Sequence, residues 1–193
     1  MIQYSVIKQT NSLGLREGFM KALLEYISHR DIYLLKMINN SWNCRSLDLI
    51  MPAMTYLGSF SFIFIFCTAA FLLSNALVGT MAVKAMISVT LSTGIGKILK
   101  VSVTRLRPFI NIPNLNIKKI SIDKYSFPSG HTAAAFSLAV IVALYFPILA
   151  FITIPLAFCV GISRMYIGVH YPTDVIVGMF IGTTCSFLTY TFS

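Results

Sequence analysis

The last 69 residues of the chain constrain its fold more than any other stretch, because residues 125–193 carry only two formal charges. A helix needs about 20 apolar residues to cross the hydrocarbon core of a bilayer, and runs close to that length recur here. The whole chain is 56% hydrophobic and 11% charged, whereas soluble domains average about 25% charged residues. These features predict an integral membrane protein.

Five segments of the chain are apolar enough to be candidate membrane spans. They are residues 59–77, 80–103, 131–146, 149–167 and 172–190. Pro147 separates the third and fourth segments with almost no loop, so these two are expected to form an antiparallel pair. The sequence therefore predicts an all-α fold, a polytopic membrane helix bundle with about five transmembrane spans.

The N-terminal region has a different pattern. In residues 20–37, apolar and charged positions alternate at roughly helical spacing, which predicts an amphipathic helix on the membrane surface. Residues 47–57 are apolar but too short to span, so they are expected to be interfacial as well, or half-inserted. The charges near the N-terminus leave no apolar run of the kind that a secretory signal needs. We therefore divide the chain into an amphipathic region, residues 1–44, and a membrane-embedded domain, residues 45–193.

The formal net charge of +9 allows two main interpretations. Basic residues commonly flank membrane spans, and a cationic site could also bind an anion in or beside the bilayer. Nucleic-acid binding is not expected, because the apolar content leaves little soluble surface for a basic face. The cysteines match no zinc-binding spacing and receive no role; they are Cys44, Cys67, Cys159 and Cys185.

Ionisable residues are concentrated at the ends of the predicted spans. An ionisable group in a span is costly and by default marks a functional site. Because helix direction alternates, the end of the second span lies on the same membrane face as the start of the third, the end of the fourth and the start of the fifth. This topology gathers Lys100, Arg107, His131, Arg164, His170 and Asp174. Snorkelling of single cations to the interface is the alternative, but the opposite face is almost bare of charge.

The cations in this set suit a phosphate. Arginine offers a planar fork that matches phosphate oxygens, and lysine offers a point charge. Ser129 and Gly130 precede an apolar helix, whose N-terminal N–H groups and dipole also favour an anion. Gly130 allows close approach of the backbone to that anion, and Ser129 can cap the helix and donate a hydrogen bond.

The spacing of His170 and Asp174 is i, i+4, which places both side chains on one face if a helix begins nearby. Pro172 suits the first turn of that helix. A carboxylate that accepts the Nδ1 proton of His170 would leave Nε2 as a nucleophile; a purely structural hydrogen bond is the alternative. His131 would serve as the general acid. A metal site is not expected, because the nearby cations would repel Zn²⁺ or Mg²⁺.

Three motifs in these residues resemble those of the type 2 phosphatidic acid phosphatases, membrane lipid phosphatases that share their site with vanadium haloperoxidases. They are Lys100-VSVTRL-Arg107-Pro108, Pro128-Ser129-Gly130-His131 and Ser163-Arg164-MYIGV-His170-YPT-Asp174. All three are complete, in order and correctly spaced. The resemblance covers about residues 45–190.

The resemblance implies a role for each motif residue. Lys100, Arg107 and Arg164 would hold the phosphate, with Ser129 and Gly130 as further donors. His170 would attack phosphorus and form a phosphohistidine, and Asp174 would orient it. His131 would protonate the leaving group and then activate water. The family needs no cofactor or metal.

The resemblance also implies a lipid phosphate as substrate. Undecaprenyl diphosphate is the favoured candidate by analogy with small family members; phosphatidylglycerophosphate and phosphatidic acid are alternatives. An anionic-lipid transporter or binding protein is the non-enzyme alternative, and a haloperoxidase is disfavoured because those proteins are soluble. We expect a multi-pass protein of the cell membrane with its site on the extracytoplasmic face, as in bacterial relatives, although the positive-inside rule favours the cytoplasm for the basic N-terminus.

Overall fold

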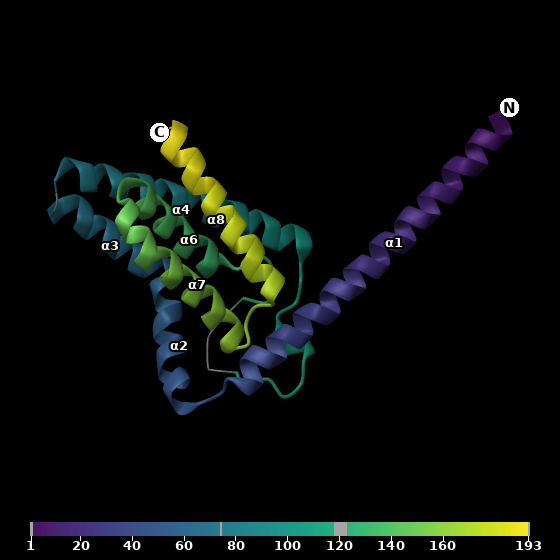
Figure 1. The fold of residues 1–193 in the computed structure, drawn as a ribbon, viewed down its shortest axis with the longest axis horizontal. Helices are drawn as coiled ribbons and strands as arrows, with labels where there is room; N and C mark the ends of the chain where they lie inside the picture. The colour runs from purple at the N-terminus through teal and green to yellow at the C-terminus, as the bar shows by residue number, and fades with distance from the viewer. Residues whose placement is uncertain (1, 74, 118–122, 193) are drawn as a thin grey trace. The chain divides into compact units, whose positions relative to one another are not determined.

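The computed structural model describes residues 2–73, 75–117 and 123–192, and helices dominate these ranges (Figure 1). The part of the chain that is described contains no β-strand, only an isolated bridge between Leu106 and Tyr125. The all-α prediction is confirmed. The helices are α1 (Ile2–Lys36), η1 (Met37–Ser41), α2 (Arg45–Leu57), α3 (Phe60–Leu73), α4 (Ala76–Val103), α5 (Pro108–Asn111), α6 (Gly130–Tyr145), η2 (Pro147–Leu149), α7 (Ala150–Tyr166) and α8 (Pro172–Phe192).

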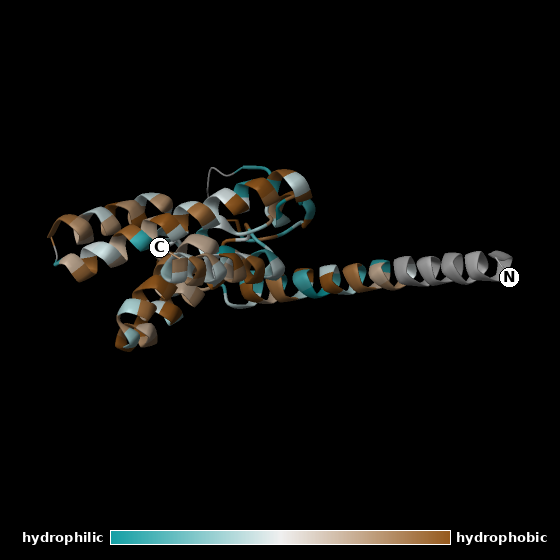
Figure 2. Ribbon diagram, turned by 90° about the horizontal axis from the view of Figure 1, so that it is seen from above, coloured by the Kyte–Doolittle hydropathy of each residue, from teal (hydrophilic) through white to brown (hydrophobic). Residues whose placement is uncertain are grey.

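The chain divides into two units, residues 1–34 and residues 35–193. The first unit consists of helix α1, apart from its last two residues. The helix predicted over residues 20–37 is confirmed up to Lys36, as the second half of this longer helix; its place on the membrane surface stays a prediction. Polar and apolar positions alternate along the coloured part of the helix, which starts at Gly18 (Figure 2).

The second unit contains the candidate spans. Among the residues that the structure describes, three helical segments are long and apolar enough to cross a membrane by themselves, namely α4, η2 with α7 (Pro147–Tyr166), and α8. Helices α2 and α3 together form a fourth candidate, bent by 58° at their junction. Helix α6 is apolar but has only 16 residues, about 24 Å of helix. The five predicted spans correspond to these segments, with residues 47–57 joined to α3.

Helix α6 lies at the centre of the bundle and packs against α8, α7 and α4 (Figure 1). Its buried positions are rich in alanine, and small residues allow helix backbones to approach closely in a membrane. The approach to α8 is so tight that a Cβ atom on Gly182 would collide with the carbonyl oxygen of Ala133. The sequence of α6 thus suits a short, fully surrounded helix.

Buried serines connect three of these helices in the interior of the bundle. Ser137 Oγ of α6 donates to Ser92 Oγ of α4 at 2.9 Å, and Ser88 Oγ lies 3.1 Å from Ser186 Oγ of α8. Ser186 Oγ also contacts the carbonyl oxygen of Ser137 at 2.9 Å. These buried hydroxyl groups serve as hydrogen-bond partners for one another, which ties α4, α6 and α8 together.

Apolar residues occupy many positions of the helices in the second unit (Figure 2). Large apolar side chains are exposed on several of the candidate spans, among them Phe64, Ile98, Phe151 and Phe180. Soluble monomers rarely present contiguous apolar surface of this extent. Together with the helix lengths, this surface supports a multi-pass membrane protein.

Candidate active site

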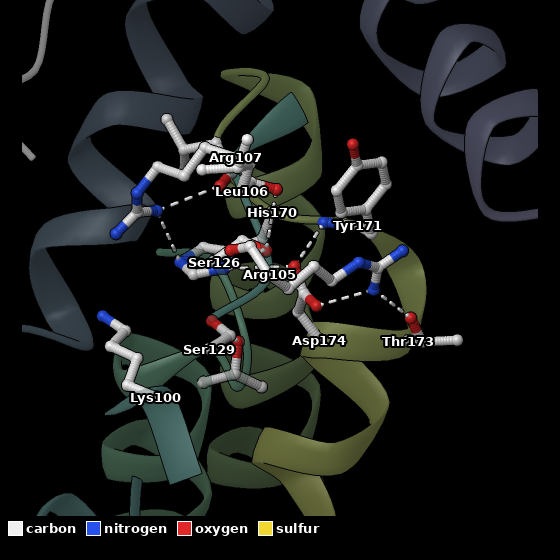
Figure 3. A network of polar contacts seen from close by, with 12 residues as sticks. Lys100, Arg105, Leu106, Arg107, Ser126, Ser129, His170, Tyr171, Thr173 and Asp174 are labelled. Atoms are coloured by element: carbon white, nitrogen blue, oxygen red, sulfur yellow. Dashed lines mark hydrogen bonds and ion pairs between the residues drawn. The ribbon is translucent and has the colours of Figure 1, made fainter. Parts of the chain in front are cut away.

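His170 lies in the short connection between α7 and α8 and is almost fully buried, with 2% of its surface exposed. Its backbone N–H and that of Val169 both donate to the carbonyl oxygen of Arg164, at 3.3 and 3.2 Å, so the turn closes on the end of α7. The imidazole Nε2 lies 3.2 Å from Nη1 of Arg107 (Figure 3).

The contact with Arg107 defines the tautomer of His170. A guanidinium group can only donate, so Nε2 accepts and carries a lone pair, and the ring proton of the neutral form is on Nδ1. Nδ1 points to the side of Asp174, with 3.6 Å to Oδ2, which is longer than a hydrogen bond. Burial lowers the pKa of His170 to about 4; Asp174 opposes this shift, and Arg164 and Arg107 add to it. His170 is therefore neutral near pH 7.

Asp174 is fully buried in the first turn of α8, which begins at Pro172 as the sequence predicts. Its Oδ2 accepts the backbone N–H of Tyr171 at 2.8 Å, and its Oδ1 accepts Nη1 of Arg105, also at 2.8 Å (Figure 3). Arg105 donates to Thr173 Oγ1 at 2.7 Å and stacks over the Tyr171 ring at 3.8 Å. The carboxylate is thus held between a cation and the histidine turn.

Arg107 is held by several hydrogen bonds. It is 2% exposed. Its Nε donates to the carbonyl oxygen of Asp123 at 2.6 Å, its Nη1 to that of Val169 at 3.0 Å, and its Nη2 to the Asp123 carboxylate. Burial lowers the pKa of Arg107, and Asp123 counteracts this shift. The guanidinium plane is therefore fixed beside His170.

Lys100, at the end of α4, shares Asp123 with Arg107. Its Nζ lies 2.7 Å from Asp123 Oδ2. Partial burial raises the pKa of Asp123, but the hydrogen bonds and charges of Lys100 and Arg107 outweigh this, and the net shift is downward. Asp123 is thus an ionised carboxylate between two of the cations that the sequence assigns to a phosphate.

Arg164 approaches from the last turn of α7 and is 3% exposed. Its Nη1 donates to Thr55 Oγ1 of α2 at 2.8 Å. Its Nε is buried and has no hydrogen-bond partner among the described residues. A buried, unsatisfied donor on a cation is costly, so this N–H is available to an anionic ligand that reaches it.

Helix α6 begins at Gly130, so its N-terminus lies where the sequence predicts. Ser129 occupies the N-cap position, but its hydroxyl makes no capping bond to the backbone and instead pairs with Thr132 Oγ1 at 2.8 Å. The expected side-chain cap is therefore wrong, because a nearby hydroxyl replaces the backbone N–H as its partner. A Cβ atom on Gly130 would meet no other atom within 4 Å. The backbone N–H of Ser129 donates to the carbonyl oxygen of Asp174 at 2.9 Å.

The structure brings the ends of α4, α6, α7 and α8 together, as alternating helix direction implies. His131, the second residue of α6, lies within electrostatic range of His170, Arg164, Lys100 and Arg107. Sequence reasoning missed Arg105, Asp123 and Thr55 as members of this site. Across the described ranges, no group of three or more His, Cys, Asp or Glu side chains is arranged to hold a metal ion.

Comparison with known proteins places this geometry in a family. The family model of the PAP2 superfamily matches residues 81–193. The chain belongs to the PAP2 superfamily. The solved structure of Aquifex aeolicus LpxE is similar, with a TM-score of 0.76 and 29% identity over 84% of this chain and 95% of that one. A PAP2 type phosphatidylglycerolphosphate phosphatase from Bacillus subtilis shares the fold, with a TM-score of 0.70, 24% identity and 86% coverage of both chains.

Curated relatives match about half of the chain. The bacitracin transport permease protein BcrC of Bacillus licheniformis is 38% identical over 103 residues, which is 53% of this chain and 50% of the relative. An undecaprenyl-diphosphatase from Sulfolobus acidocaldarius is 36% identical over 107 residues, with the same coverage of 53% and 50%. The chain thus spans about half the length of these curated relatives.

Proposed function

We propose that this chain is an integral-membrane phosphatase of lipid phosphates that works through a phosphohistidine, with undecaprenyl diphosphate as its substrate. The observation that carries the proposal is the contact of His170 with Arg107, backed by Asp174. It presents a neutral nitrogen nucleophile beside a phosphate-binding guanidinium group. The similarity to an undecaprenyl-diphosphatase supports the choice of substrate.

In the first step, Nε2 of His170 attacks the terminal phosphorus. The N–P bond forms as the bond to the leaving oxygen breaks, and His131 donates a proton to that oxygen. Arg107, Arg164 and Lys100 stabilise the negative charge on the phosphoryl oxygens, with Ser129 and Gly130 as further donors. Asp174 stabilises the positive charge that develops on the imidazole.

In the second step, water attacks the phosphohistidine. His131 accepts a proton from the water as the new P–O bond forms and the N–P bond breaks, which returns His170 to its neutral state. Both steps use only side chains of this chain, so we propose that the reaction needs no metal. The lipid tail remains in the bilayer, and the site faces the extracytoplasmic side.

Phosphate release from a lipid panel tests the proposal. The purified full chain in detergent is given undecaprenyl diphosphate, phosphatidylglycerophosphate or phosphatidic acid. We expect release from undecaprenyl diphosphate to be fastest, and His170→Ala to abolish it with an unchanged thermal unfolding temperature. Faster release from phosphatidylglycerophosphate would reassign the substrate, and lipid binding without release by the wild type would favour the transporter or binding protein.

A further inference from the structure

The proposed phosphate site already contains an anionic group, the side-chain carboxylate of Asp123. Its Oδ2 is 2.7 Å from Lys100 Nζ, and its Oδ1 accepts from Arg107 Nη2. The backbone carbonyl oxygen of Asp123 accepts from Arg107 Nε at 2.6 Å. A phosphate held by the same two cations needs the N–H groups that this carboxylate now uses.

All three nitrogen atoms of Arg107 are engaged in this state, with Asp123, with Val169 and with His170. A bidentate contact between a guanidinium group and a phosphate requires two of these nitrogens to face the ligand. The Asp123 carboxylate therefore has to leave Nη2 before a phosphate can bind there.

The two partners differ in their access to water. The side chain of Asp123 is 55% exposed, so its carboxylate can turn into solvent at little cost in hydration. Arg107 is 2% exposed, and a buried cation without a counter-ion is costly. An anionic partner for Arg107 is thus favoured at every stage of turnover, whether it is the Asp123 carboxylate or the phosphate of the substrate.

Building on the proposed function, we propose that Asp123 sets the affinity of the site for phosphates: its carboxylate occupies Lys100 and Arg107 between turnovers and competes with substrate and product. Every phosphate ligand has to displace the same carboxylate. The apparent binding constants of all such ligands are therefore weakened by one common factor. After hydrolysis, the carboxylate takes the place of the departing inorganic phosphate.

The substitution Asp123→Asn tests this inference, because a neutral amide is a much weaker partner for the two cations. The KM for farnesyl diphosphate, a short-chain probe, and the Ki for inorganic phosphate are measured on the purified full chain at constant ionic strength. We expect both to fall by the same factor, about fivefold or more, with kcat within about threefold of wild type. Asp123→Glu keeps the carboxylate and should restore values close to wild type.

A matched control separates direct competition from a general change in charge. Asp48, near the start of α2, is also a carboxylate and accepts a hydrogen bond from Tyr166 at 2.7 Å. Asp48→Asn changes the net charge by the same amount and should leave KM and Ki near wild type. Equal effects of the two substitutions would overturn the proposal.

The direction of the change in KM distinguishes competition by Asp123 from a positioning role. If Asp123 served only to orient Lys100 and Arg107, Asp123→Asn would raise KM and lower kcat, and this result or unchanged constants would refute the inference. Thermal unfolding in increasing inorganic phosphate gives a readout without turnover. If no lipid is hydrolysed, the proposed function fails, while phosphate should still stabilise Asp123→Asn at lower concentrations than wild type.

Discussion

The protonation of His170 decides whether the site can act at neutral pH. The ring is buried beside Arg107 and Arg164, and these surroundings lower its pKa to about 4, against about 6.5 for an exposed histidine. A nucleophilic imidazole must be neutral at Nε2. Burial thus keeps the proposed nucleophile neutral across the physiological range.

We therefore expect His170 to titrate near pH 4 in the ligand-free protein. Because the folded-state pKa is lowered, the neutral form persists as the pH falls through 6.5, and Nε2 is lost as a nucleophile only near pH 4. ¹⁵N NMR of labelled histidine measures this directly, with His170→Gln to assign the signal. A midpoint near pH 6.5 would contradict the burial argument.

The motif residues and the pairing of His170 with Asp174 could be predicted from the sequence, but the other partners could not. The spacing of His170 and Asp174 indicates a shared face because the helix period fixes it. The pairs Arg105–Asp174 and Arg107–Asp123 join residues separated by 69 and 16 positions. Such contacts depend on the path of the loop between α4 and α6, which carries no periodic signal.

At the scale of the elements, the site depends on close packing of α6 against α8, since each helix begins with residues of the site. Gly182 allows that packing, because a Cβ atom there would collide with the carbonyl oxygen of Ala133 and lie 3.0 Å from Ser137 N. Backbone atoms cannot move aside as a flexible side chain can.

We expect Gly182→Ala to destabilise the protein by about 1–3 kcal/mol through overpacking. The matched control is Gly94→Ala in α4, where a Cβ atom would meet nothing within 4 Å and helix propensity favours alanine by roughly 0.5–1 kcal/mol. Thermal unfolding in detergent compares the two. A Gly182→Ala protein as stable as the control would show that the helices can separate freely.

The helix boundaries illustrate what local sequence can and cannot predict. Proline and charged residues predict that the last span begins at Pro172 and that the second ends near Val103. Helix α8 begins at Pro172 and helix α4 ends at Val103, as predicted. The bend between α2 and α3 was not predicted. At Gly58 the backbone comes so close to α6 that a Cβ atom would lie 2.7 Å from the carbonyl oxygen of His131, and this tertiary contact leaves no local pattern.

At the scale of the whole molecule, the site gathers at one end of the helices that surround α6. Cys44 lies at this end, because Asp48 N–H donates to its carbonyl oxygen at 3.0 Å and Asp48 bonds to Tyr166, the last residue of α7. Cys44 is exposed, whereas Cys67 and Cys185 are buried. Labelling of Cys44 can therefore report which membrane face the site occupies.

If the site faces the extracytoplasmic side, a membrane-impermeant maleimide should label Cys44 in intact cells as fully as in permeabilised cells. Cys44→Ser should reduce labelling to background, which assigns the signal. Labelling that requires permeabilisation would place the site on the cytoplasmic face, as the basic N-terminus favours under the positive-inside rule.

The steric course at phosphorus tests most directly whether His170 forms a phosphohistidine. A lipid thiophosphate that is chiral through oxygen isotopes is hydrolysed in isotopically labelled water, and the configuration of the released thiophosphate is determined. Two successive in-line displacements, by His170 and then by water, predict net retention of configuration. Inversion would mean that water attacks phosphorus directly, and it would contradict His170 as the nucleophile.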